Sequence, residues 1–232
     1  MSGSLAALLA RAGRSQRKVP MSRDEANFWN LIHAERRRLL ALLETLTDDQ
    51  WAYPSLCGRW TVEQVTAHLT AAAHTGTLAW IFSIVRAGFN PAKHNDRLLS
   101  RYLGETPDHT LNEYRASVEL TVSPTKDYAA FLGETIVHGQ DIAQPLGLNL
   151  TPDPTALLEV AQFFAAKDFA VNSKTLVSGL RLHATDADFM TGTGPLVEGP
   201  LLALVMVMAG RERYLDHLTG DGLSELGARL RK

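Results

Sequence analysis

The sequence predicts a mainly helical protein, with a four-helix bundle followed by a smaller α+β domain. Apolar residues recur at helical spacing in four successive segments, and the connections between them are short enough for an antiparallel bundle. The pattern then changes, because residues 175–184 alternate with the two-residue period of a strand. We therefore expect a mobile extension over residues 1–21, a helical bundle over 22–148 and an α+β domain over 149–232.

The first helix of the bundle is predicted to begin at Ser22. Ser22 and Glu25 have the three-residue spacing of a capping box, and apolar residues continue at helical spacing to about Leu46. The run Arg36-Arg-Arg38 interrupts this apolar pattern. We interpret these arginines as the solvated face of an amphipathic helix.

A second capping box, Thr61 with Gln64, opens a helix that we expect to run over residues 62–86. This helix carries His68 on its apolar side. A lone histidine on such a face is more often a hydrogen-bonded core residue than a metal ligand. His74 lies about 240° round the helix from His68, so the two cannot readily share an ion.

The remaining elements follow from periodicity and from Gly and Pro positions. We expect helices near 96–103, over 111–122, from about 126 to 144, and over 156–171, strands over 175–184 and 189–193, a loop or strand over 194–199, a buried helix over 201–218 and a short helix over 224–230.

The fourth bundle helix carries a polar stripe. Glu134 and His138 are four residues apart and Asp141 follows three later, so all three project from one face of a helix. A carboxylate and an imidazole on adjacent turns make half of a metal site. A buried Glu–His pair held by hydrogen bonds explains the same spacing, so the residues alone leave both interpretations open.

The composition excludes several classes of partner. Hydrophobic residues make up 45% of the 232 residues and the net charge is −2, which indicates neither nucleic acid nor an anionic membrane as a partner. The single cysteine, Cys57, excludes an internal disulfide and fits a reducing cytoplasm. No secretory signal is recognisable, and the apolar run 201–209 is too short to span a bilayer. We expect a cytoplasmic monomer or homodimer.

Two motifs resemble those of the mycothiol-dependent maleylpyruvate isomerase family, a branch of the DinB-like bundles. The first is Trp51-Ala-Tyr-Pro-Ser-Leu-Cys-Gly-Arg-Trp-Thr-Val-Glu-Gln-Val-Thr-Ala-His-Leu69. The second runs from Glu134 to Gly147 as Glu-x-x-x-His-Gly-Gln-Asp-Ile-x-x-Pro-Leu-Gly. Short pieces around Arg181, Gly210-Arg211 and Gly220 also fit the second domain of that family.

The resemblance implies a metal-dependent enzyme. By matching position, the ligands of a divalent ion, with Zn²⁺ as the expected metal, are His68, Glu134 and His138. Two imidazoles and one carboxylate leave a free coordination position, as in catalytic sites, and such an ion lowers the pKa of a bound thiol. The thiol cosubstrate is then mycothiol of actinobacteria rather than Cys57. The metal-bound thiolate would isomerise a small unsaturated acid by addition, rotation and elimination, or be transferred to a small electrophile.

Two further residues are candidates for the site. Asp141 is placed to fix the imidazole of His138, with a helix-surface salt bridge as the alternative. Arg211 is suited to a substrate carboxylate, with a structural ion pair as the alternative. We expect Cys57 to be a small buried core residue.

Other functions remain compatible with the same ligand types. A hydrolase that uses metal-bound water, a non-catalytic metal or small-molecule binding protein, and a two-His-one-carboxylate iron oxygenase each need no more than these residues.

Overall fold

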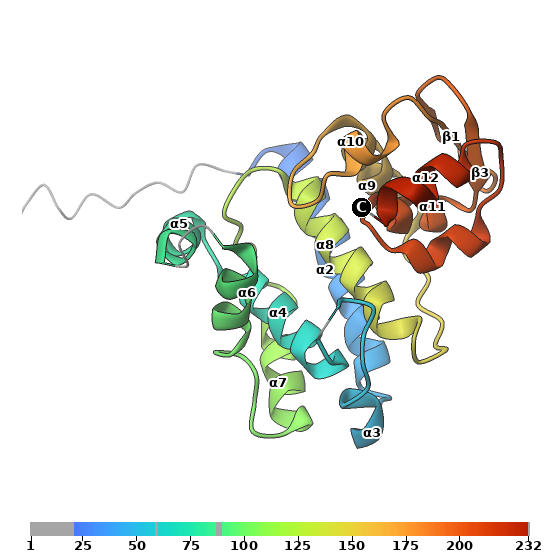
Figure 1. The fold of residues 1–232 in the computed structure, drawn as a ribbon. Helices are drawn as coiled ribbons and strands as arrows, with labels where there is room; N and C mark the ends of the chain where they lie inside the picture. The colour runs from blue at the N-terminus through green and yellow to red at the C-terminus, as the bar shows by residue number, and fades with distance from the viewer. Residues whose placement is uncertain (1–20, 59, 87–89, 232) are drawn as a thin grey trace, which may run out of the picture.

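The computed structural model describes residues 21–58, 60–86 and 90–231, and all but the last residue of the extension predicted over 1–21 lie outside them. The chain is mainly helical, as predicted, with one small sheet (Figure 1). The bundle and the elements beside it are α2 (Arg23–Leu43), α3 (Asp48–Trp51), α4 (Val62–His74), α5 (Thr77–Arg86), α6 (Pro91–Leu99), α7 (Pro107–Ser117) and α8 (Tyr128–Ala143). None of the helices in this described part combines the length and the apolar character that crossing a bilayer requires.

Both predicted capping residues begin helices. The Ser22 hydroxyl accepts a hydrogen bond from the Glu25 amide at 3.1 Å, and Thr61 with Gln64 forms a complete capping box at the start of α4. The single helix predicted over 62–86 is wrong, because Thr75 takes an extended backbone conformation and separates α4 from α5. The Thr75 hydroxyl donates to the last turn of α4, which it helps to end.

The bundle differs from the expected simple antiparallel arrangement, because α2 and α8 run parallel. Trp29 and Tyr128, near the starts of these two helices, have ring centroids 5.6 Å apart, and Leu43 and Ile142, near their ends, share one apolar cluster. The segment containing α5 and α6 explains the difference. It carries the chain back along the bundle, so that α7 begins beside the start of α4 and runs in the same direction.

The C-terminal elements lie on the other side of α2 and α8 (Figure 1). They are α9 (Pro154–Ala166), α10 (Ser173–Val177), β1 (Arg181–Ala184), β2 (Met190–Thr191), β3 (Leu196–Gly199), α11 (Leu201–Met208), the 3₁₀ helix η1 (Glu212–His217) and α12 (Leu223–Leu230). In the sheet β1 is central, antiparallel to β2 and parallel to β3.

Several predicted elements in this region are shorter than expected. The helix predicted over 156–171 ends at Ala166, and the strand predicted over 189–193 is reduced to Met190–Thr191. The first three residues of the strand predicted over 175–184 belong to helix α10, and only Arg181–Ala184 forms β1. The helix predicted over 201–218 ends at Met208, because the backbone at Gly210 has φ +87°, a left-handed conformation that ends a helix and suits glycine. The turn that follows places residues 211–213 beside the bundle.

Helices α2 and α8 contribute to two apolar cores. Their first halves, with Ile32 and Leu132 fully buried, pack into the cluster formed by α9, α11 and the sheet. Their second halves pack with α4 and α7 in the core of the bundle. The predicted division of the chain at residue 148 stays a prediction, but the apolar packing is continuous across that position.

The arginine run of α2 is only partly solvated, which corrects our interpretation. Arg37 is exposed and pairs with Glu119, whereas Arg36 is buried. The Arg36 guanidinium donates to the carbonyl oxygens of Ser117 at 3.4 Å and Leu120 at 3.0 Å. A buried cation at the C-terminal end of α7 is favourable, because unpaired carbonyls there carry partial negative charge.

We predict that Leu132→Ala lowers the free energy of unfolding by about 2–5 kcal/mol, because it opens a cavity in the core that joins α8 to the C-terminal elements. The control is Leu78→Ala, which removes a leucine that is 83% exposed and should change stability by less than about 0.5 kcal/mol. Urea denaturation measures both values. Equal stability of the two variants would show that this core contributes little.

Candidate metal centre

Two helices bring the three predicted metal ligands together. His68 projects from the middle of α4, and Glu134 and His138 project from adjacent turns of α8. His68 Nε2 lies 3.1 Å from Glu134 Oε1, and one ligand atom from each of the three residues lies within 4.8 Å of the others. Two ligand atoms on a tetrahedral zinc ion are about 3.3 Å apart, so this grouping is within reach of one ion.

Asp141 fixes the orientation of the His138 ring. The His138 Nδ1 hydrogen is donated to Asp141 Oδ2 at 2.9 Å, and the Asp141 side chain is fully buried. Because Nδ1 is committed in this way, Nε2 is the nitrogen of His138 that remains for a cation. Of the two alternatives for Asp141, the structure shows the hydrogen bond to the imidazole and not a salt bridge on the helix surface.

Arg211 reaches the same carboxylate from the C-terminal part of the chain. Its Nε donates to Asp141 Oδ1 at 3.0 Å and its Nη2 donates to Oδ2 at 2.6 Å, while Nη1 donates to the carbonyl oxygen of Ala209. This is a two-pronged pairing of guanidinium and carboxylate. The structure therefore places Arg211 in an ion pair with Asp141, which was the alternative to contact with a substrate.

The surroundings favour the protonation states that a metal site needs. Burial by itself raises the pKa of Glu134, but its hydrogen bond with His68 and the positive charge of Arg36 act in the opposite direction, and the pKa lies below its usual value. Burial lowers the pKa of His138. Burial also works against ionisation of Asp141, but its hydrogen bonds with His138 and Arg211 lower the pKa of that carboxyl. Near neutral pH the site therefore holds two carboxylates and a neutral His138.

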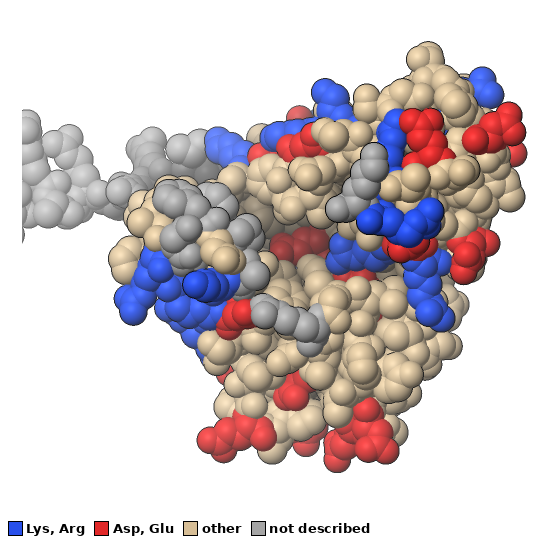
Figure 2. Space-filling view, viewed as in Figure 1, with Lys and Arg blue, Asp and Glu red and all other residues tan. Residues whose placement is uncertain are grey.

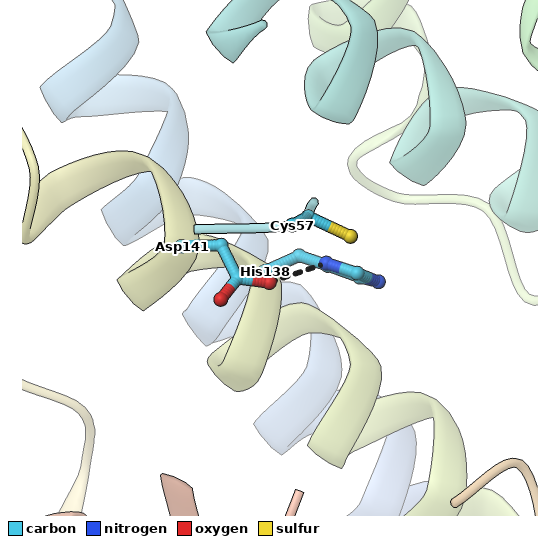
Figure 3. Close-up of side chains that lie close together, drawn as sticks. All are labelled: Cys57, His138 and Asp141. Carbon is cyan, nitrogen blue, oxygen red and sulfur yellow. Dashed lines mark hydrogen bonds and ion pairs between the residues drawn. The ribbon is translucent and has the colours of Figure 1, made fainter. Parts of the chain in front are cut away.

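A second group of ligand-type atoms lies beside the first. Cys57 Sγ, a His138 nitrogen and an Asp141 oxygen are also within 4.8 Å of one another (Figure 3). Both Asp141 oxygens are already occupied by Arg211. Burial also raises the pKa of the Cys57 thiol to about 11, so its thiolate is disfavoured. The group of His68, Glu134 and His138 is therefore the better candidate for a divalent cation. Cys57 is half-buried and packs against the core of the bundle.

A cavity of about 620 Å³ adjoins this centre. Its wall is formed by the connection before α4, by α6 and by the turn after α11. The lining residues are Leu56, Cys57, Gly58, Trp60, Asn95 and the consecutive residues 210–213. The Trp60 ring lies 4.9 Å from the ring of His68, centroid to centroid. Figure 2 shows the hollow between the bundle and the C-terminal elements, with basic and acidic side chains inside it. The candidate centre thus has room beside it for a small molecule.

Comparison with known proteins identifies a domain within the chain. Residues 32–124 match the model of the mycothiol maleylpyruvate isomerase N-terminal domain. The matched segment runs from α2 to the residues just before α8.

Solved structures share the fold of this chain over most of its length. The chain is similar to a crystal structure of the mycothiol-dependent maleylpyruvate isomerase, with a TM-score of 0.59 and 16% sequence identity over 85% of this chain and 92% of that one. A histidine-to-alanine mutant of that enzyme gives a TM-score of 0.60 with the same identity and coverage. No curated protein matched the sequence significantly. At this identity the structures show the shared fold, whereas the metal ligands of this chain stay a prediction.

Sequence patterns found the polar centre but missed part of its surroundings. Trp60 belongs to the first motif, yet its place against His68 depends on how the connection before α4 folds back. Asn95 and Arg213 reach the cavity from distant segments, and no local spacing marks them. His74, which was excluded as a partner of His68, stacks on Tyr102 at 4.8 Å.

We predict that His68→Ala lowers the affinity for Zn²⁺ by more than about 100-fold, since even residues that only orient a metal ligand are worth about 10- to 100-fold. His74→Ala is the matched control, because it removes a histidine from the same helix outside the centre. Competition with a chromophoric chelator measures both affinities. Parental Zn²⁺ affinity in His68→Ala would exclude His68 as a ligand.

We also predict that Asp141→Ala lowers the free energy of unfolding by about 3–5 kcal/mol in metal-free buffer, because Arg211 is then left as an unpaired buried charge. Asp127→Ala removes a partly exposed partner of Lys167 from the start of the same helix and should cost no more than about 1 kcal/mol. Chemical denaturation distinguishes the two. A cost for Asp141→Ala as small as that of the control would contradict a structural role of the pair.

Proposed function

We propose that this chain is a metal-dependent, mycothiol-dependent enzyme that isomerises a small cis-unsaturated acid or transfers the thiol to a small electrophile. The observation that supports this most is the convergence of His68, Glu134 and His138 beside the cavity. The match of residues 32–124 to the mycothiol maleylpyruvate isomerase N-terminal domain supports the choice of thiol. The proposal includes Zn²⁺ as the metal and the cytoplasm as the location.

The residues around the proposed metal ligands have separate roles. When bound, a divalent ion supplies an electrophilic position that lowers the pKa of a coordinated thiol. Asp141 holds the His138 ring in one tautomer, and Arg211 holds Asp141. Trp60 covers one side of His68 and limits the access of water to it.

The proposed reaction conserves atoms and electrons. The sulfur of the thiolate forms a bond to one carbon of the double bond, and the π electron pair moves to the other carbon and its conjugated carbonyl group, which leaves a single bond that can rotate. The electron pair then returns and breaks the carbon–sulfur bond, which restores the double bond in the trans geometry and releases the thiolate. In the transferase form, the carbon that received the electron pair takes up a proton from water, and the protonated adduct is the product. The raised pKa of Cys57 disfavours it as the attacking sulfur, which is why the proposal uses an added thiol.

We predict that zinc-loaded protein isomerises a cis-enoic acid only when mycothiol is added, and that His68→Ala lowers the rate by at least about 100-fold, because the thiol loses its activating ion. His74→Ala should keep parental activity. A spectrophotometric assay of cis–trans conversion, run with and without the thiol, measures these rates.

The same assay separates the alternatives. Hydrolytic turnover without thiol would replace the proposal with a hydrolase that uses metal-bound water. Tight metal binding without turnover of any enoate or electrophile would indicate a binding protein. Iron as the metal in protein purified without added metal would indicate the two-His-one-carboxylate oxygenase chemistry.

A further inference from the structure

The cavity beside the metal centre is positioned to hold the substrate. Its wall includes Trp60, which packs on His68, and Cys57, whose sulfur lies close to His138. A molecule in the cavity therefore lies next to two of the three proposed ligands. Its recognition must come from the remaining polar side chains of the wall.

Among the described residues of the wall, Arg213 is the cation without an ion-pair partner. Three ionisable residues of the turn after α11 line the cavity, namely Arg211, Glu212 and Arg213. The charge of Arg211 is balanced by Asp141, and Glu212 accepts a hydrogen bond from Arg231 at 2.8 Å. Arg213 is exposed and makes no ion pair or side-chain hydrogen bond with any residue that the structure describes. The described part of this turn thus presents one net positive charge to the cavity.

Arg211 is poorly placed to take a substrate carboxylate. The edge of its guanidinium formed by Nε and Nη2, which suits a carboxylate, is already occupied by Asp141. Moving Arg211 to a substrate would leave Asp141 as a buried anion with fewer partners, which is unfavourable. Arg213 can offer the same guanidinium edge without breaking an existing contact.

We propose that Arg213 is the residue that binds a carboxylate of the substrate, with Asn95 supplying a second polar contact from α6. The side-chain amide of Asn95 reaches the same cavity and makes no hydrogen bond with the described residues, so it can donate to a carboxylate oxygen. This proposal rests on the proposed function, because it names the residue that recognises the acid group of that substrate.

Binding of maleate, the simplest cis-butenedioic acid, tests this without turnover. Calorimetric titration of the zinc-loaded protein, with no thiol present, measures the Kd of maleate and of the uncharged maleic diamide. Arg213→Gln should weaken maleate binding by about 10- to 100-fold, the usual loss for a charge-assisted hydrogen bond. It should leave binding of the diamide unchanged. Arg101→Gln, which removes an exposed arginine elsewhere on the bundle, should leave both affinities within twofold of the parent.

Two results would overturn the proposal. One is parental maleate affinity in Arg213→Gln, and the other is no maleate binding by the parent protein. A weakened affinity that is fully restored by Arg213→Lys would support recognition of charge, whereas partial restoration would support the two-pronged guanidinium contact. Absence of thiol-dependent turnover with intact Arg213-dependent binding would overturn the proposed reaction alone. Thiol-dependent turnover with unchanged affinity in Arg213→Gln would overturn the present inference alone.

Discussion

The buried carboxylate of Asp141 is the constraint on which the site depends. An unpaired carboxylate in this position would be very unfavourable, so its partners must be in place when the chain folds. Those partners are His138 on the same helix and Arg211 from the turn after α11. The main-chain oxygen of Asp141 also accepts from the Leu56 amide at 3.0 Å. Three segments far apart in the sequence thus meet at one residue.

This meeting point explains why the metal centre and the cavity lie together. The backbone contact of Leu56 with Asp141 brings Cys57 and Trp60 next to the two histidines. The ion pair of Arg211 with Asp141 brings the turn after α11 to the opposite part of the wall. Because α8 packs on both α2 and α9, the same helix positions the proposed ligands and joins the bundle to the C-terminal elements. Stability and chemistry therefore depend on the same packing.

The two arginines of the turn have different roles in this arrangement. A guanidinium paired with a buried carboxylate contributes mainly to the orientation of that carboxylate and of the imidazole that it holds. A guanidinium on the cavity wall without an ion-pair partner can instead recognise an incoming anion. The structure assigns the first role to Arg211, and we infer the second for Arg213. Arg211 and Arg213 are two positions apart, and their roles differ because Arg211 contacts a buried carboxylate and Arg213 faces the cavity.

The sequence alone determined the mainly helical class, the capping residues Ser22 and Thr61, and the polar stripe of α8, since all of these depend on spacing within one helix. It also indicated the resemblance to mycothiol maleylpyruvate isomerases, which the match of residues 32–124 to their N-terminal domain supports, because the motifs lie within continuous segments. Tertiary structure decided that α2 and α8 run parallel, that Arg36 is buried, and that Arg211 pairs with Asp141. These features depend on which distant segments pack together. Arg211 and Asp141 are 70 positions apart, and no spacing pattern in the sequence indicates that they pair.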